Sequence, residues 1–223
     1  MNDEKNQGKK AETGTNEPDF KKDDEIKSRL KQQFEFILEI DKEKEIERQT
    51  PLADGSRKEN DAEHAWHMAI MVMLFSEYAN ESIDVLRTIE MLLIHDLVEV
   101  YSGDTYAYDE EGKKTQKMRE EAAAQKLYHL LPQDQGEQLY QLWEEFEEEK
   151  TNEAKFARTM DNLQPMMLNA ASNGISWKEH EVKLSQILKR NEKTQDGSLV
   201  LWQYAKEMFL EPSVKAGYIA DDV

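Results

Sequence analysis

The sequence predicts an all-α protein with one principal domain. Leu, Met, Glu and Lys are abundant, hydrophobic residues make up 38% of the chain, and only five prolines and nine glycines are available to separate strands. Apolar residues also recur at three- and four-residue steps, which is the spacing of one helix face. A chain of 223 residues can bury one sizeable core, and we expect a single domain over residues 25–212.

Residues 1–24 are predicted to form a disordered charged tail. This segment mixes both charge signs with Gly, Thr, Asn and Pro18, and it has almost no apolar residues to offset the entropy of ordering. The chain then predicts an amphipathic helix from Ile26 to Leu38 and a short helix from Lys42 to Gln49. A loop that contains proline and glycine is expected from Thr50 to Glu59.

A helix is predicted from Asp61 to Tyr78, with Asn60 as its N-cap. Acidic residues in the first turn favour this start, because the helix dipole stabilises negative charge there. We expect this helix to bury an apolar stripe that consists of Trp66, Ile70, Met73 and Leu74.

The rest of the chain predicts further helices separated by loops. A central helix runs from Ile83 to Tyr101, and an acidic, tyrosine-containing loop follows from Ser102 to Glu111. The later predicted helices span Lys113–Leu131, Gln133–Glu149, Asn152–Ala171, Lys178–Arg190 and Ser198–Leu210. Pro132 should separate the first two of these, and Pro165 should kink the third. Residues 213–223 carry no strong pattern and are predicted to be a C-terminal tail.

Composition excludes several classes of function. A formal net charge of −18 argues against binding along a nucleic-acid polymer, because that mode depends on a basic surface. No apolar run approaches 18 residues and no signal-peptide pattern is present, so we expect no membrane partner and a cytoplasmic location. Because the chain has no cysteine, a metal site would use His, Asp and Glu, which select hard or borderline ions.

The segment Ile89–Asp104 carries the strongest candidate site. His95 and Asp96 interrupt its helical apolar rhythm, where a buried helix normally has apolar side chains. A divalent metal would satisfy both groups, although a lone His-Asp pair is more often only hydrogen-bonded. In a continuous helix Glu99 would share their face. Asp104 follows a glycine and would lie just past the helix end, facing Asp96.

Two polar residues stand out on other predicted helices. His64 lies in a first turn within ENDAEH, and Asp161 lies mid-helix within AKFARTMDNLQPMML, where a core residue is expected. Each has an ordinary explanation on its own. An early-turn histidine can cap or pack, and Asp161 can pair with Arg158.

Together these residues give the order H, then HD, then D on three predicted helices. With the segments RKENDAEHAWHMAIM, LLIHDLVEVYSGD and AKFARTMDNL, residues 30–190 resemble the HD-domain superfamily of metal-dependent phosphohydrolases, in the branch of the 5'-deoxynucleotidases and HD-domain-containing protein 2. The resemblance implies a homodimer of helical bundles with about eight to ten helices each. It also implies one divalent ion, of Mn, Co, Fe, Zn or Mg, held by His64, His95, Asp96 and Asp161.

The resemblance further implies the catalytic residues. In that branch the glutamate of HDxxE and the aspartate of GD take part in catalysis, and they match Glu99 and Asp104. One would orient or deprotonate the attacking water and the other would serve the leaving oxygen or the sugar, with exchangeable roles. An arginine upstream anchors the phosphate, and Arg48 is its match. Gln49 follows it where some relatives have a tryptophan that lines the nucleoside pocket, so base selectivity stays open.

The proposed substrate-binding residues have structural alternatives. Arg48 could instead pair with Glu45 or Glu47 on its own short helix, as a surface residue that contributes little to the core. Arg57 could contact the phosphate or pair with nearby acids such as Glu63.

The remaining histidines bear on the number of metal ions. His67 lies three positions after His64 and could contact substrate, or support the site by packing. Dinuclear HD phosphodiesterases have additional histidines between the HD pair and the last aspartate. Only His129 lies in that interval here, which favours a single metal ion.

The function implied by the resemblance is hydrolysis of deoxynucleoside 5'-monophosphates to nucleoside and phosphate, with a small nucleotide as the binding partner. One alternative is an HD hydrolase of a cyclic nucleotide, a nucleoside triphosphate or an alarmone. The other is a non-catalytic regulatory module that binds metal or nucleotide. Glu99 and Asp104 argue against the module, since a metal-binding scaffold needs neither.

Overall fold

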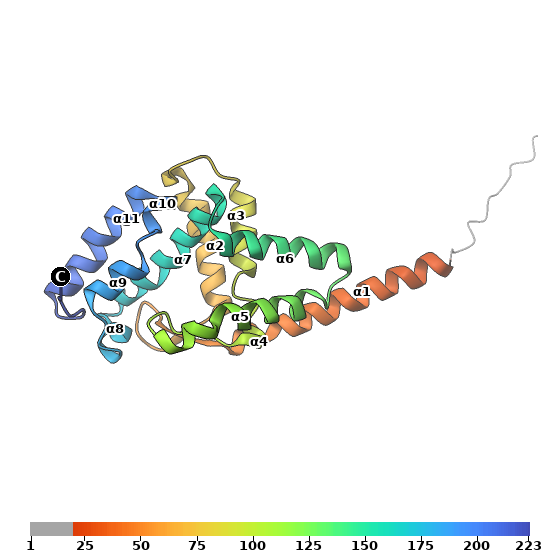
Figure 1. The fold of residues 1–223 in the computed structure, drawn as a ribbon, viewed down its shortest axis with the longest axis horizontal. Helices are drawn as coiled ribbons and strands as arrows, with labels where there is room; N and C mark the ends of the chain where they lie inside the picture. The colour runs from red at the N-terminus through yellow and green to blue at the C-terminus, as the bar shows by residue number, and fades with distance from the viewer. Residues whose placement is uncertain (1–19) are drawn as a thin grey trace, which may run out of the picture.

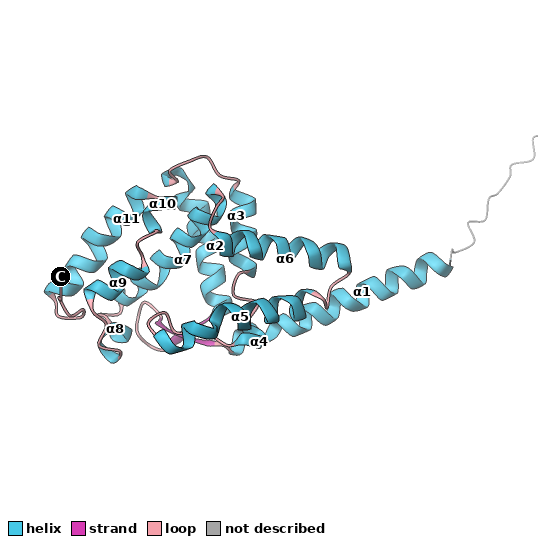
Figure 2. Cartoon of the chain, viewed as in Figure 1, coloured by secondary structure: helices cyan, strands magenta, loops and turns pink. Residues whose placement is uncertain are grey.

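The computed structural model describes residues 20–223, with the backbone alone for residues 20–22 and 110. Within this part of the chain there are eight α-helices of seven or more residues and four shorter α-helical segments. Strands occur there only in one two-stranded sheet, as Figure 2 shows. The predicted all-α bundle of about eight to ten helices is confirmed. No helix of the described residues is long and apolar enough to cross a membrane.

Helix α1 (Phe20–Ile40) projects from one end of the molecule, and its C-terminal half lies beside the bundle (Figure 1). Arg29 of this helix pairs with Asp134, with 2.7 Å between Nη1 and Oδ1, and Phe36 is buried. The helix begins before residue 25, so residues 20–24 of the predicted tail are helical. Residues 1–19 of that tail lie outside the described residues.

A small antiparallel sheet replaces part of the predicted helix and loop that follow. A 3-10 helix, η1 (Asp41–Glu45), leads into strand β1 (Glu47–Pro51), which pairs with β2 (Lys58–Asn60). The helix predicted to reach Gln49 was therefore wrong at its end, because this residue lies in β1. The strand β1 could not be predicted from its own residues, because it is stabilised by pairing with β2, which comes later in the chain.

Helix α2 (Asp61–Phe75) begins where the sequence predicts. The Asn60 side chain accepts a hydrogen bond from the Glu63 N–H at 2.9 Å, and the Glu63 carboxylate accepts one from the Asn60 N–H at 3.1 Å. These two bonds form a capping box. A 3-10 helix, η2 (Ser76–Tyr78), follows.

The predicted apolar stripe of α2 was wrong. Its members are exposed, with Trp66 at 63%, Ile70 at 39%, Met73 at 61% and Leu74 at 62%. The buried apolar face consists of Ala65, Met68, Ala69, Met71 and Val72. Since α2 is apolar on nearly every face, the spacing alone could not select the buried one.

The central helix predicted from Ile83 to Tyr101 is broken at the His-Asp pair. Helix α3 (Val85–Ile94) ends at its C-cap, His95, and the one-turn helix α4 (Glu99–Ser102) follows a short irregular segment. A single straight helix is therefore wrong here.

A hydrogen bond from His95 accounts for the break. Nδ1 of His95 lies 3.0 Å from the Leu92 carbonyl, which the N–H of Asp96 would use in a continuous helix. The next turn is tighter, because the Glu99 N–H bonds three residues back to the Asp96 carbonyl at 2.8 Å.

Three long helices agree closely with the prediction. They are α5 (Glu110–Tyr128), α6 (Gln133–Glu148) and α7 (Asn152–Ala171). Pro165 lies inside α7, and the kink expected there stays a prediction.

The C-terminal helices are short: α8 (Ile175–Glu179), α9 (Leu184–Arg190), α10 (Thr194–Gly197), α11 (Leu199–Ala205), the π-helix η3 (Lys206–Leu210) and α12 (Glu211–Lys215). The single helix expected over Lys178–Arg190 was wrong. The structure also differs from the predicted tail over residues 213–223, because Ile219 is buried in the core and the Ala220 N–H bonds to the Val182 carbonyl at 3.3 Å.

Two apolar clusters form the interior. The larger joins α2, α3, α7 and the C-terminal helices, and it includes Met68, Met91, Phe156, Met160 and Ile187. The smaller lies among α1, α5 and α6 and includes Phe36, Leu127 and Trp143. Leu92 belongs to the first cluster and Leu97 to the second. His95 and Asp96 therefore lie where the two clusters meet.

Candidate metal centre and pocket

Three parts of the fold bring the four predicted metal ligands together. His64 comes from the first turn of α2, His95 and Asp96 from the break after α3, and Asp161 from the middle of α7. One donor atom each of His64, His95 and Asp96 lies within 4.8 Å of the others. Oδ1 of Asp161 lies 3.2 Å from Nε2 of His64 and 3.9 Å from Nε2 of His95.

Hydrogen bonds fix the orientation of both imidazoles. Nδ1 of His64 lies 3.0 Å from Oε1 of Gln164, and Nδ1 of His95 lies 3.0 Å from the Leu92 carbonyl. Because both partners are acceptors, each Nδ1 carries a proton and each Nε2 faces the carboxylates. Nε2 of His95 is buried without a hydrogen bond, although Asp96 Oδ2 is 3.0 Å away. Two imidazole nitrogens and two carboxylates in this arrangement fit one divalent ion.

The carboxylates also compete with a metal by holding protons on the imidazoles. Burial and the Arg48 charge act to lower the pKa of His64, but the hydrogen bond with Asp161 and the nearby Glu59 carboxylate outweigh them and raise it to about 9. Burial is likewise outweighed at His95, where the Asp96 charge raises the pKa. Metal binding would therefore displace protons from the site.

Glu99 and Asp104 lie beside the four ligands and line the same pocket. Glu99 begins α4, and Asp104 follows Gly103, whose φ of 72° lets the chain turn back. Burial raises the pKa of both carboxyl groups, and the charge of Asp96 raises it further. Oε2 of Glu99 is buried without a hydrogen-bond partner. Such a carboxyl group holds a proton more readily than an exposed one, which suits a group that exchanges protons with a substrate or water.

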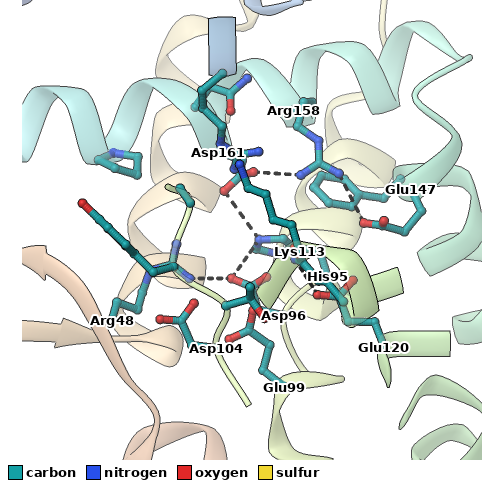
Figure 3. A pocket seen from close by; sticks show the side chains of 18 of the residues that line it. Arg48, His95, Asp96, Glu99, Asp104, Lys113, Glu120, Glu147, Arg158 and Asp161 are labelled. Carbon is teal, nitrogen blue, oxygen red and sulfur yellow. Dashed lines mark hydrogen bonds and ion pairs between the residues drawn. The ribbon is translucent and has the colours of Figure 1, made fainter. Parts of the chain in front are cut away.

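Arg48 lies inside the site rather than on the surface. Its Nη1 is 2.8 Å from Oδ2 of Asp96 and 3.1 Å from Oδ1 of Asp61, and its side chain is 15% exposed. Figure 3 shows Asp96 between Arg48 and His95. The alternative in which Arg48 pairs with Glu45 or Glu47 on a short helix was wrong, as was the expectation that it contributes little to the core.

Most of these side chains line one cavity of about 670 Å³, and His64 lies buried behind its wall. Its walls come from β1, the segment after α4, and helices α5 to α8, and the metal-ligand candidates His95, Asp96 and Asp161 are among its lining residues (Figure 3). A pocket of this size can enclose a nucleotide-sized molecule.

The HD domain family matches residues 40–202 of the chain. The protein belongs to the HD domain family. Two relatives, the 5'-deoxynucleotidases HDDC2 of Homo sapiens and Mus musculus, are each 34% identical over 115 residues, which are 52% of this chain and 54% and 56% of theirs. The matched region thus spans about half the length of these curated relatives. A solved structure, described as a predicted metal-dependent phosphohydrolase from Magnetospirillum magnetotacticum, has a TM-score of 0.83 and 44% identity, covering 87% of this chain and 97% of that one.

Three sequence-predicted residues of this HD protein do not line the pocket: His64, which is buried behind it, and the proposed substrate contacts Arg57 and His67. Arg57 is about half exposed and pairs with Glu63, with 2.8 Å between Nη1 and Oε2. This ion pair is the alternative to phosphate contact that the sequence offered, and Arg57 does not line the pocket. His67 stacks on Trp66 at 6.0 Å between ring centroids, and its Nδ1 lies 3.3 Å from Nε2 of Gln164. His67 therefore reaches the site only through Gln164.

Sequence reasoning missed Gln164, and it named Arg158 only as an ordinary partner of Asp161, although both residues orient candidate metal ligands. Gln164 holds His64 and donates from Nε2 to Oε2 of Glu59 at 2.7 Å. Arg158 donates to Oδ2 of Asp161 at 2.9 Å, so the pairing foreseen for Asp161 is present while its Oδ1 faces the imidazoles. The available signal was spacing: residues 158, 161 and 164 are polar at three-residue steps, which places them along one face of an otherwise apolar helix.

Proposed function

We propose that this HD protein is a metal-dependent phosphomonoesterase that hydrolyses deoxynucleoside 5'-monophosphates to nucleoside and phosphate. The observation that carries the proposal is the pair of imidazoles held with Nε2 toward two carboxylates at the wall of the pocket. The names of the relatives, 5'-deoxynucleotidase and metal-dependent phosphohydrolase, support this reaction class.

In the proposed mechanism, His64, His95, Asp96 and Asp161 hold one divalent ion. When bound, such an ion polarises a phosphoryl oxygen and lowers the pKa of a coordinated water. Mn, Co, Fe, Zn and Mg all accept this donor set, and a metal panel would identify the active one.

The chain's own residues would supply the proton transfers and orient the phosphate. Glu99 orients or deprotonates the attacking water, and Asp104 serves the leaving oxygen or the sugar hydroxyl, with roles that can be exchanged. Arg48, beside Asp96, offers the positive charge and fork geometry that suit a phosphate. The negative field of the whole protein makes this local cation more important.

The decisive experiment measures hydrolysis of a panel of deoxy- and ribonucleoside monophosphates, with cyclic nucleotides, nucleoside triphosphates and alarmones alongside, and with each divalent metal added in turn. Hydrolysis of deoxynucleoside monophosphates supports the proposal. Activity confined to cyclic nucleotides, triphosphates or alarmones would replace it with another HD hydrolase. Metal binding without turnover of any of these would indicate a regulatory module instead.

We also propose that the protein forms a homodimer through the apolar face of α1. This face consists of residues that are 45–72% exposed although apolar: Ile26, Leu30, Phe34, Ile37 and Leu38. A contiguous exposed apolar surface of this kind is typical of an interface. Light scattering should give a dimer mass for the wild type and a monomer mass for Phe34→Glu. The cytoplasmic location expected from the sequence stays a prediction.

A further inference from the structure

The pocket has two sides of opposite character along α7. On the side formed by α5 and α6, before Asp161, charged side chains gather: the carboxylates Glu120, Glu144, Glu147 and Glu148 and the cations Lys113, Lys117 and Arg158. On the other side, after Asp161, the lining is mainly aromatic, apolar or amide: Tyr106, Tyr108, Met166, Asn169 and Trp177. An uncharged planar ring suits the second side. Binding such a ring on the first side would remove water from several carboxylates, which costs free energy.

One face of α7 connects this second side to the metal centre. Asp161, Pro165 and Asn169 follow one another at four-residue steps, and all three line the pocket. Eight residues of α-helix span about 12 Å, which is comparable to the reach from the phosphate to the base of an extended nucleotide. A phosphate near Asp161 would thus leave a base near Asn169.

Asn169 presents a buried acceptor without a partner. The residue is 4% exposed, and its Nδ2 donates to the Pro165 carbonyl at 3.0 Å. This bond fixes the amide orientation, so the atom left free of any hydrogen bond is Oδ1. Asn162 repeats the arrangement two turns nearer the metal centre: Nδ2 donates to Oγ1 of Thr194 at 3.0 Å and Oδ1 has no partner.

Buried amide oxygens are normally hydrogen-bonded, so two of them on one pocket wall call for a ligand that donates. We propose that the Asn169 side of the pocket is the nucleobase subsite, and that Oδ1 of Asn169 accepts a hydrogen bond from an N–H group of the base. The ring then lies against Met166 and Trp177. Asn169 is then a specificity-determining residue. The assignment rests on the proposed function, because it requires the substrate phosphate to lie at the metal centre.

The test compares substrates that differ only in the group that Asn169 would read. Wild-type enzyme is assayed with deoxyadenosine monophosphate and with purine deoxyriboside monophosphate, whose base has no N–H. We expect KM to be about tenfold higher for the second, the usual cost of one neutral hydrogen bond to a buried acceptor. Equal KM values in the wild type would overturn the proposal without any variant.

Variants then locate the effect. Asn169→Leu should raise KM for deoxyadenosine monophosphate about tenfold and remove the difference between the two substrates, while KM for 2-deoxyribose 5-phosphate, which has no base, stays unchanged. Asn152→Leu, an exposed position on the same helix, should leave all three KM values unchanged. An equal change for the baseless substrate in Asn169→Leu would show a structural effect and overturn the proposal.

A separate measurement keeps this subsite distinct from the proposed reaction. If the wild type hydrolyses no nucleoside monophosphate, calorimetry with unphosphorylated deoxyadenosine and its N–H-free analogue decides. Tighter binding of deoxyadenosine to the wild type, lost in Asn169→Leu, would uphold the subsite while the proposed reaction fails. Equal binding of the two nucleosides, or none, would overturn the subsite.

Discussion

Nδ1 of His64 lies 3.0 Å from Oε1 of Gln164, and both side chains are fully buried. The orientation of the glutamine amide is determined by its other end, since Nε2 donates to Oε2 of Glu59 at 2.7 Å. Oε1 must then accept, so His64 carries its proton on Nδ1 and turns Nε2 toward Asp161. A fully buried glutamine in a core helix would otherwise have no evident reason to be there.

Gln164→Leu should weaken metal binding by about 10- to 100-fold, the usual effect of removing the partner that orients a ligating histidine. The leucine keeps most of the volume but cannot accept the Nδ1 proton, so the ring loses its fixed tautomer and orientation. Titration of chelator-treated protein with Mn or Co gives the affinity. His67→Leu is the matched control, because His67 touches Gln164 but not His64. Unchanged affinity in Gln164→Leu would contradict this role.

His95→Ala and Asp96→Ala should each abolish metal retention and phosphatase activity together. Each substitution removes one of the four metal donors. With only three donors left, a buried charged group also loses its partner. Metal content by mass spectrometry, measured with activity on the same preparation, checks this. A variant that keeps full metal content and turnover after either change would remove the basis of the metal assignment.

Glu99→Gln should keep the metal but lower kcat by about 10²- to 10⁴-fold, the range for loss of a general acid or base. The amide preserves the size of the side chain and cannot take up a proton. Loss of metal together with activity would instead make Glu99 a ligand.

The sequence drew attention to two of the candidate ligands and to most long helices for a physical reason, while the full ligand set came from the family resemblance and stays a prediction. Polar residues in apolar helices, such as His95 and Asp161, are conspicuous because burial without a partner is costly. The break after α3 could not be predicted, because it arises from a side-chain bond between His95 and the Leu92 carbonyl rather than from proline or glycine.

The exposed stripe of α2 shows a second limit. Trp66 and Met73 have the spacing of a buried helix face but are exposed. The buried face of α2 is the adjacent one, which carries His64 and packs against α3 and α7. Helix α2 is apolar on most sides, so only tertiary contacts select which side is buried. The buried pairs of Arg48 could not be predicted for a related reason, since its partner carboxylates at residues 61 and 96 come later in the chain and are brought to it only by the fold.

Arg48→Ala should therefore lower both activity and stability. Its guanidinium is the partner of two buried carboxylates, Asp61 and Asp96, and removing one member of a buried charge pair costs about 3–5 kcal/mol. Arg48→Lys should recover part of the stability through its charge but little of kcat/KM, because an ammonium cannot bind phosphate through two parallel hydrogen bonds.

Arg57→Ala is the control for Arg48, because its pair with Glu63 is exposed and such pairs are worth under about 1 kcal/mol. Urea denaturation and kcat/KM are measured for all three variants. If Arg48→Ala matched Arg57→Ala in both measurements, Arg48 would be neither a buried partner nor the phosphate anchor.

Glu120→Gln should stabilise the protein at pH 8 and have no effect near pH 4. Glu120 is 9% exposed, and burial raises its pKa from an ordinary 4.5 to about 7. Below pH 4.5 the group is protonated in both the folded and unfolded states. As pH rises from 4.5 to 7 the unfolded state releases this proton first, so the folded state loses stability, and the loss is complete above pH 7. Each pKa unit corresponds to about 1.4 kcal/mol, so we expect a gain of about 1–3 kcal/mol at pH 8.

The hydrogen bond to Glu120 makes this substitution conservative. Nε2 of Gln116 donates to Oε1 of Glu120 at 2.8 Å, and the amide oxygen of a glutamine can accept the same bond. Glu121→Gln, at the exposed neighbouring position, removes the same charge without relieving burial and should change stability little at any pH. Denaturant unfolding of the three proteins from pH 4 to pH 8 gives the comparison. A gain in Glu120→Gln that is independent of pH would show that the substitution acts through packing and not through the buried charge.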